Sequence, residues 1–133
     1  MATYSKTNWL RARLQNHVLG LAAWTMPTLV ELGLYTVAPT ASTPGTEVTG
    51  SGYGRKLLTA SNLTTALAGE PNVNSAAFTF TASADWGFIR AWGVLVGGSP
   101  PDLALFCIPD DIVEVLSGDT YTIPVGRLRY DEV

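Results

Sequence analysis

Residues 76–83, AAFTFTAS, alternate strictly between two sets of side chains. In an extended chain Ala76, Phe78, Phe80 and Ala82 lie on one face, and mostly hydroxyl side chains lie on the other. Successive side chains of a strand point to opposite faces, so this period of two is typical of a strand with one face in a core. The stretch therefore predicts a sheet protein.

Other segments have the composition of strands. They are TLVELGLYTVA (28–38), WGFIRAWGVLVGG (86–98), DLALFCIP (102–109), DIVEVL (111–116) and TYTIPVGRLRY (121–130). Turn-forming sequences such as GGSPPD and SGD separate them, and Pro124 favours an edge or a bulge for the last strand. Short strands separated by turns predict a mainly β protein, an antiparallel β-sandwich or jelly-roll-like barrel.

The residues before the first strand have a helical period instead. Apolar side chains recur at Leu10, Leu14, Val18 and Leu21. Ser5 or Thr7 can cap the start of a helix, and Gly20 can end it. We therefore expect a helix over residues 5–20 and a β-sandwich over residues 28–130, which together form a single domain of residues 1–133. The apolar stripe is narrow, so we expect the helix to lie along a sheet edge or against a partner.

The core is predicted from the strand faces that carry the larger apolar side chains. It consists of Leu32, Leu34, Phe78, Phe80, Phe88, Val94, Leu105 and Ile123. This choice treats residues 86–98 as one strand, with Trp86, Phe88, Trp92 and Val94 on the same face.

The composition limits the partners of this chain. Charged residues make up 14% of the 133 residues, about half the ~25% usual in soluble domains, and the net charge is −3. A surface with so few charges is suited to a subunit packed against neighbours. Nucleic-acid binding needs a basic stripe, which this chain lacks. No apolar run reaches the ~20 residues of a membrane-spanning helix, and the first 18 residues lack the order of a secretory signal. We expect a protein made in the cytosol, with no nucleic-acid or membrane partner.

The segment GTEVTGSGYGRKLL (45–58) has three glycines within five residues, followed by Arg55 and Lys56. A phosphate-binding loop would need the Walker spacing, or a buried strand before the glycines and a helix after them. The segment has neither arrangement. We expect a bulge or tight bend that places Arg55 and Lys56 at the sheet rim, and no nucleotide or other cofactor.

The residues that could support catalysis are few. His17 is the single histidine, and we expect its imidazole to be packed or hydrogen-bonded. Asp110 and Asp111 follow a proline and are typical of a turn, and Cys107 lies in an apolar run. We expect no catalytic, cofactor or metal site, and so no enzyme. A carbohydrate-binding sandwich stays open as an alternative, with Trp86, Trp92 and Tyr53 as a stacking platform. Exposure of those rings would separate this alternative from a structural role.

Four stretches together resemble a family of small tailed-phage virion proteins, often labelled phage tail fibre or phage structural proteins. They are LQNHVLGLAAWTMPTLVELGLYTVAPT, GTEVTGSGYGRK, NSAAFTFTASADWGFIRAWGVLVGG and SGDTYTIPVGRLRY. The resemblance covers nearly the whole chain and includes no catalytic signature. The Arg90-Ala91-Trp92 stretch and the YDEV ending depart from the family pattern, which leaves the attachment partner open.

This resemblance implies a structural component of a tailed-phage virion, assembled in the host cytoplasm with other virion proteins as partners. A domain of this size has a radius of gyration of ~14 Å and is a bead and not a long fibre. A small decoration or cement protein on the capsid is therefore our first interpretation, and a tail accessory or tail-fibre protein is the alternative. Such assemblies are symmetric, and we expect a homo-oligomer, with a trimer favoured.

Two segments are candidates for contact with major capsid or tail proteins. The first is the apolar side of the N-terminal helix, and the second is the loop APTASTPG (38–45). The candidate interface residues are Trp9, Leu10, Leu14, Val18, Pro39, Thr40 and Pro44. Trp9 is the kind of residue that anchors protein interfaces.

Overall fold

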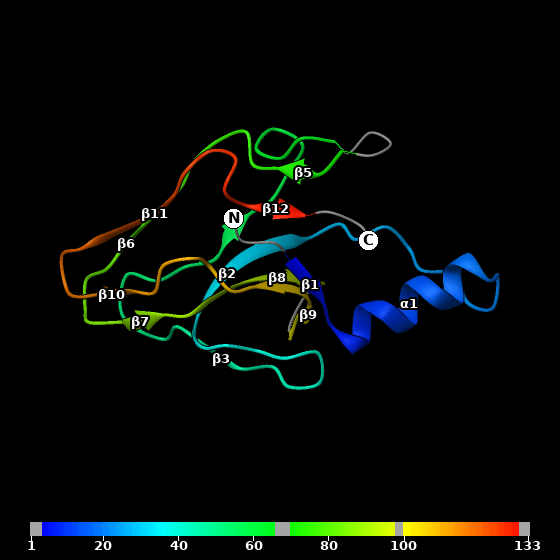
Figure 1. Cartoon of the computed structure of the whole chain (residues 1–133), viewed down its shortest axis with the longest axis horizontal. Coiled ribbons are helices and arrows are strands. Elements are labelled where there is room, and N and C mark those ends of the chain that lie inside the picture. Colours follow the sequence, from blue (N-terminus) through cyan, green and yellow to red (C-terminus); the bar gives the residue numbers. More distant parts are fainter. Residues whose placement is uncertain (1–3, 66–69, 98–99, 131–133) are drawn as a thin grey trace.

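A computed structural model describes residues 4–65, 70–97 and 100–130. Its elements are β1 (Tyr4–Lys6), α1 (Asn8–Val18), β2 (Val30–Val37), β3 (Thr46–Glu47), β4 (Lys56–Leu57), β5 (Asn72–Val73), β6 (Phe78–Thr81), β7 (Gly87–Ile89), β8 (Ala91–Val96), β9 (Asp102–Cys107), β10 (Val113–Val115), β11 (Thr120–Ile123) and β12 (Arg129–Tyr130). The predicted class, mainly β with one N-terminal helix, is confirmed (Figure 1).

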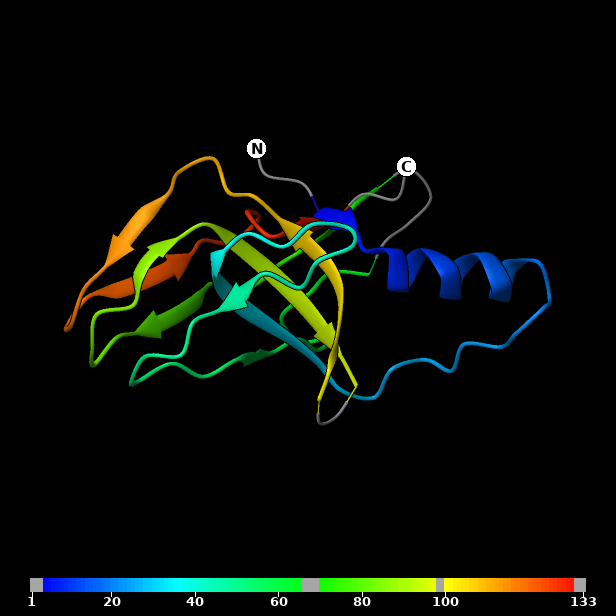
Figure 2. The ribbon, with the colours of Figure 1, turned by 90° about the horizontal axis from the view of Figure 1, so that it is seen from below.

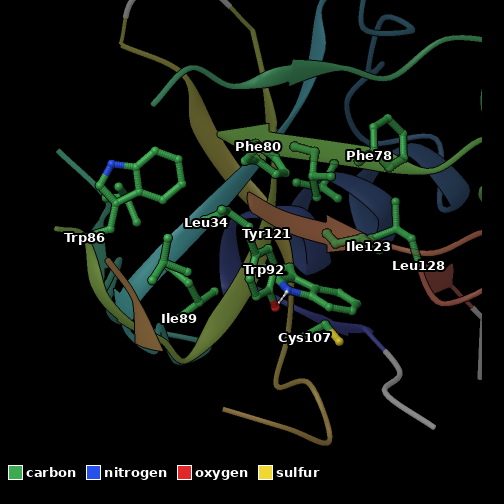
Figure 3. Packing of buried hydrophobic residues seen from close by; sticks show 14 of the residues in the cluster. Leu34, Phe78, Phe80, Trp86, Ile89, Trp92, Cys107, Tyr121, Ile123 and Leu128 are labelled. Carbon is green, nitrogen blue, oxygen red and sulfur yellow. Dashed lines mark hydrogen bonds between the residues drawn. The ribbon is translucent and has the colours of Figure 1, made fainter. Parts of the chain in front are cut away.

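The strands form one larger sheet and three two-stranded ladders, and all the pairs are antiparallel. The larger sheet has the order β1-β9-β8-β2-β3, and β4 also pairs with β2. The ladders are β10-β7, β11-β6 and β12-β5. Apolar side chains of the sheet and of all three ladders meet in one core, as Figure 3 shows for 14 of them.

Most of the predicted core is confirmed. Leu32, Leu34 and Ile123 have no exposed surface, and Phe78, Phe80 and Val94 are also buried. Leu105 is partly buried against the same cluster. In β6 and β11 the buried residues alternate with exposed threonines, which is why the sequence located Phe78, Phe80 and Ile123.

The prediction for Phe88 is wrong, because residues 86–98 are not one strand. The chain forms β7 and β8, which are separated at Arg90. Gly87 has a φ of +87°, and this left-handed residue breaks the alternation between Trp86 and Phe88. Ile89 is consequently buried in place of Phe88, which is 44% exposed with the Arg90 guanidinium 5.4 Å from its ring centroid.

The N-terminal helix is shorter than the predicted 5–20. Residues 4–6 form an edge strand against β9, so their hydrogen bonds to a neighbouring strand replace helical ones. Thr7 is the N-cap: its hydroxyl accepts the Leu10 N–H at 3.3 Å and donates to the Leu103 carbonyl at 2.8 Å. The helix ends at Val18, and Gly20 follows with a φ of +72°.

The end of α1 is a Schellman turn. The Leu21 N–H donates to the Asn16 carbonyl at 2.8 Å, and the Gly20 N–H donates to the His17 carbonyl at 3.2 Å. Figures 1 and 2 show α1 projecting from one end of the long axis, while β7 and β10 lie at the opposite end. The helix is thus an arm on a β body.

Candidate partner interface

The base of α1 is fixed to the body and its tip is not. Leu10 is buried against Val96 and Ala104, and Leu14 is partly buried beside them. Val18, one turn further on, is 79% exposed. Of the predicted interface residues on the helix, only Val18 therefore offers most of its side chain to a partner.

Trp9, in the first turn of α1, contacts the segment that follows the helix. Its ring makes an edge contact with Trp24, with centroids 6.0 Å apart and planes at 88°. The Arg13 guanidinium lies 4.6 Å from the Trp9 ring centroid, and His17 Nδ1 accepts the Trp24 N–H at 3.1 Å. The imidazole is hydrogen-bonded, as predicted, but it is exposed and not packed. These contacts keep residues 19–29 folded back along the helix.

The predicted loop contact lies beside the helix base. The Asn8 N–H donates to the Ala41 carbonyl at 2.9 Å, and Trp9, Thr40 and Pro44 line one shallow depression of about 340 Å³. Pro39 is buried and does not reach this surface. The structure thus brings together three of the seven candidate residues.

The loop is ordered by its own side chains. Thr40 Oγ1 accepts the Thr43 N–H at 3.0 Å and lies 2.6 Å from Thr43 Oγ1. Such hydroxyl turns fix a loop locally, so this rim of the depression has a defined shape.

Three exposed apolar residues beyond the helix were missed as interface candidates. Leu19, Leu21 and Met26 are 70%, 74% and 82% exposed. Leu21 was assigned to the helical stripe, but the turn at Gly20 takes it off the helix. The signal available in sequence was the combination of a helix-ending glycine with apolar residues on both sides of it.

The glycine-rich segment of residues 50–54 is in close contact with the chain around Thr81 and Trp86. A Cβ on Gly50 would lie 2.3 Å from the Trp86 ring, and one on Gly52 would lie 2.7 Å from the Thr81 carbonyl. Gly52 also has a φ of +86°, and the Trp86 indole donates to the Ser51 carbonyl at 3.0 Å. Gly50 thus leaves room for the Trp86 ring, and Gly52 allows the chain to approach the backbone at Thr81, which confirms the predicted bend.

A partly buried polar cluster holds the same segment against the sheet. The Arg55 guanidinium donates to both carboxylate oxygens of Glu47, at 2.8 and 2.7 Å, and lies 3.7 Å from Glu31. The Tyr53 hydroxyl donates to Glu47 and accepts the Leu34 N–H at 3.0 Å. Burial, followed by the hydrogen bond to Glu47, raises the pKa of Tyr53 well above its usual range. The hydrogen bond to Glu47 also raises the pKa of Arg55. The two short hydrogen bonds between Arg55 and Glu47 make this an ion pair of defined geometry.

Two rings of the proposed carbohydrate platform, Trp86 and Trp92, are buried, and the third, Tyr53, is partly buried. Trp86 and Trp92 are 7% and 6% exposed, and the Trp92 indole donates to the Tyr121 hydroxyl at 2.9 Å. Tyr53 stacks on Phe80 within the same core. Stacking on a sugar requires an open ring face, so these three residues do not form such a platform.

Cys107 is a buried thiol, as its apolar run predicts. Burial, with a smaller contribution from the charge of Asp110, raises its pKa from the ordinary 9.0 to about 12. In the described ranges, no three of the His, Cys, Asp and Glu side chains gather as metal ligands would. No helix among the described residues is long and apolar enough to span a membrane.

The comparison with protein families identifies the family of this chain. A family model described as "Podophage GP4 fiber I protein gp80" matches residues 5–131, which is nearly the whole chain. A search of curated proteins found no match.

Proposed function

This chain belongs to the podophage GP4 fiber I protein gp80 family, and from this we propose that it is a non-enzymatic structural component of a phage tail fibre. The family is one of tailed-phage virion structural proteins, as the sequence resemblance indicated. Its description favours the tail-fibre alternative over the capsid decoration that was our first interpretation. The match over residues 5–131 is the observation that carries this proposal.

The shape of the protein suits a joint in such a fibre. One copy, a β body with a projecting helix, is too short to form a long fibre by itself. We propose that it is a compact subunit at which fibre segments meet or attach. Its partners would be other virion proteins, and its location would be the assembled particle.

The surface supports attachment through uncharged contacts. The depression lined by Trp9, Thr40 and Pro44 is mostly neutral, with Asp102 at its rim. Val18, Leu19 and Leu21, near the tip of the helix, are exposed. Adjacent exposed apolar side chains are typical of a surface that contacts another protein. We propose that these two surfaces contact neighbouring virion proteins.

The placement can be tested by electron microscopy of virions carrying an immunogold label on this protein, combined with mass spectrometry of purified particles. We expect the protein in the particles and the label at the tail. Label spread over the capsid would restore the decoration interpretation, and absence from purified particles would contradict both placements.

A further inference from the structure

A pocket lies between the larger sheet and the β12-β5 ladder. Val30, Val94 and Leu105 line it from the sheet, Tyr130 lines it from the ladder, and Leu63 lines it from the loop after β4. Its volume is about 180 Å³. Protein interiors contain few voids larger than a water molecule, so an apolar pocket of this volume beside the core is a candidate binding site.

The lining of the pocket is apolar and uncharged. Of its nine residues in the described part of the chain, six are valine or leucine and none carries a formal charge. The Asn72 side-chain nitrogen already donates to the Thr64 carbonyl at 2.9 Å, and the Tyr4 hydroxyl is buried. Water needs several polar partners to be held in a cavity, and a charged ligand needs an opposite charge. The pocket therefore suits an uncharged apolar molecule.

Hydrogen bonds fix the chain on both sides of the pocket. The Leu58 N–H donates to the Val30 carbonyl at 2.9 Å, which ties the loop after β4 to the sheet. Near the ladder, the Leu128 N–H donates to Asn74 Oδ1 at 3.0 Å, and Asn74 has no exposed surface. A cavity stays open when its surroundings cannot relax inward, and a preformed site loses little conformational entropy when it binds.

The pocket also has an entrance. Val30, Leu63, Leu105 and Tyr130 are partly buried and pack against the main core cluster, so each keeps some contact with solvent. A small molecule can therefore reach the pocket while the sheet and the ladder stay folded.

We propose that this pocket binds a small uncharged apolar molecule of about the size of a single aromatic ring. Dry cavities of about 150 Å³ lined by aliphatic and aromatic side chains bind benzene, and this pocket has a similar volume. The bound molecule contacts the sheet on one side and the ladder on the other, so it stabilises the packing of the two. The site lies outside the candidate partner interface, and the proposal does not rest on the fibre function.

The first test measures the melting temperature of the purified chain with toluene as the probe. Benzoate, which carries a carboxylate on the same ring, is the matched control ligand. We expect toluene to raise the melting temperature by an amount that saturates with concentration, because it binds the folded chain. Benzoate should leave the melting temperature unchanged. Equal effects of the two compounds, or no saturable effect of toluene, would overturn the proposal.

The second test fills the pocket. Leu63→Trp places a larger side chain in its lining and should weaken toluene binding about tenfold or more. Leu116→Trp is the matched control, because it makes the same substitution at a residue that is 43% exposed and does not line the pocket. This control should bind toluene like the wild type, and equal binding by both variants would contradict the site.

Methyl NMR of the wild type locates the bound toluene without any substitution. The methyl resonances of Val30, Leu105 and Leu128 should shift in proportion to occupancy, while those of Leu116 and Val125 should stay in place. Shifts confined to methyl groups outside the pocket would refute the assignment even if toluene stabilises the protein.

Discussion

The Tyr53 hydroxyl accepts the backbone N–H of Leu34 at 3.0 Å, in the middle of β2. On this edge β2 pairs with β4 at Glu31 and Leu32 and with β3 from Tyr35 onward, so Leu34 lies between the two short strands. The Tyr53 side chain thus supplies the hydrogen bond that no neighbouring strand supplies to the Leu34 N–H. The loop of residues 48–55 is thereby tied to the sheet that it crosses.

Tyr53→Phe should lower the free energy of unfolding by about 1–3 kcal/mol, because it leaves the Leu34 N–H and a Glu47 oxygen without this partner. Tyr4→Phe is the control: the Tyr4 hydroxyl is buried and has no hydrogen-bond partner in the described part of the chain. Its removal should change stability by less than about 0.5 kcal/mol or increase it. Urea unfolding of both variants measures the difference, and equal losses would contradict the role assigned to Tyr53.

Phe80→Ala should cost about 3–5 kcal/mol, since the ring is 2% exposed and its loss leaves a cavity. Phe88→Ala removes the same atoms from a ring that is 44% exposed and should cost less than about 1 kcal/mol. Thermal and denaturant unfolding of the pair would check this. Similar costs at the two positions would mean that the β7 face is misassigned.

The glycines of the 50–54 segment should differ sharply in tolerance. Gly52→Ala should destabilise the fold by at least about 1 kcal/mol, because φ is +86° and the Thr81 carbonyl lies 2.7 Å from the new Cβ. Gly54→Ala meets nothing within 4 Å and should be neutral. Melting temperatures of the two single variants provide the comparison, and a harmless Gly52→Ala would show that this close approach is not required.

Asn74 should not tolerate aspartate. Its side-chain nitrogen donates to the Ala76 and Pro124 carbonyls, both at 2.9 Å, and its oxygen accepts the Leu128 N–H at 3.0 Å. Asn74→Asp keeps the shape of the side chain but replaces the donating nitrogen with an oxygen that cannot donate to the two carbonyls. The position has no exposed surface, so water cannot take the place of the lost donor. We expect a loss of more than about 2 kcal/mol at neutral pH. Asn62→Asp, on a less buried residue, is the comparison, and an equal effect there would argue against a special role for Asn74.

Stability should fall as the pH rises above about 9. The Cys107 thiol ionises near 9.0 in the unfolded chain and near 12 in the folded one, so the folded state holds its proton more tightly. The resulting contribution is complete below pH 9.0 and is lost between that value and about 12. Cys107→Ala should flatten the profile between pH 9 and 10. Above about 10 the buried tyrosines, whose pKa values are also raised from 10.0, add their own loss of stability. A thiol reagent at pH 8 should react with the wild type only after unfolding, and rapid labelling of the native protein would contradict the burial.

Sequence periodicity predicted the strands that have one polar face and could not resolve those that have none. In β6, threonines alternate with Phe78 and Phe80, and the buried side follows directly. In β8, all residues from Ala91 to Val96 are buried, so no alternation marks the inner face. The break at Gly87 was hidden for the same reason. A glycine inside an apolar run gives no sign of its φ until neighbouring strands constrain it.

The candidate interface was predicted in part. Trp9, Thr40 and Pro44 do lie together, because β1 and the Asn8 contact bring the helix base to the loop. The arm was not foreseen as a separate feature, since its direction depends on the edge strand β1, whose three residues carry too little pattern to be recognised. Its exposure follows from tertiary placement and not from local sequence.

The core joins residues that are far apart along the chain: Tyr4 on β1 packs in the same cluster as Tyr121, Ile123 and Leu128. The ribosome synthesises the chain from the N-terminus. The contacts of β1 with the last strands can therefore form only after almost all the later strands have left the exit tunnel. Contacts of such wide sequence separation form late and slowly. The body should therefore close only after synthesis is nearly complete, and a chain cut short in translation would not yield a folded subunit able to enter a particle.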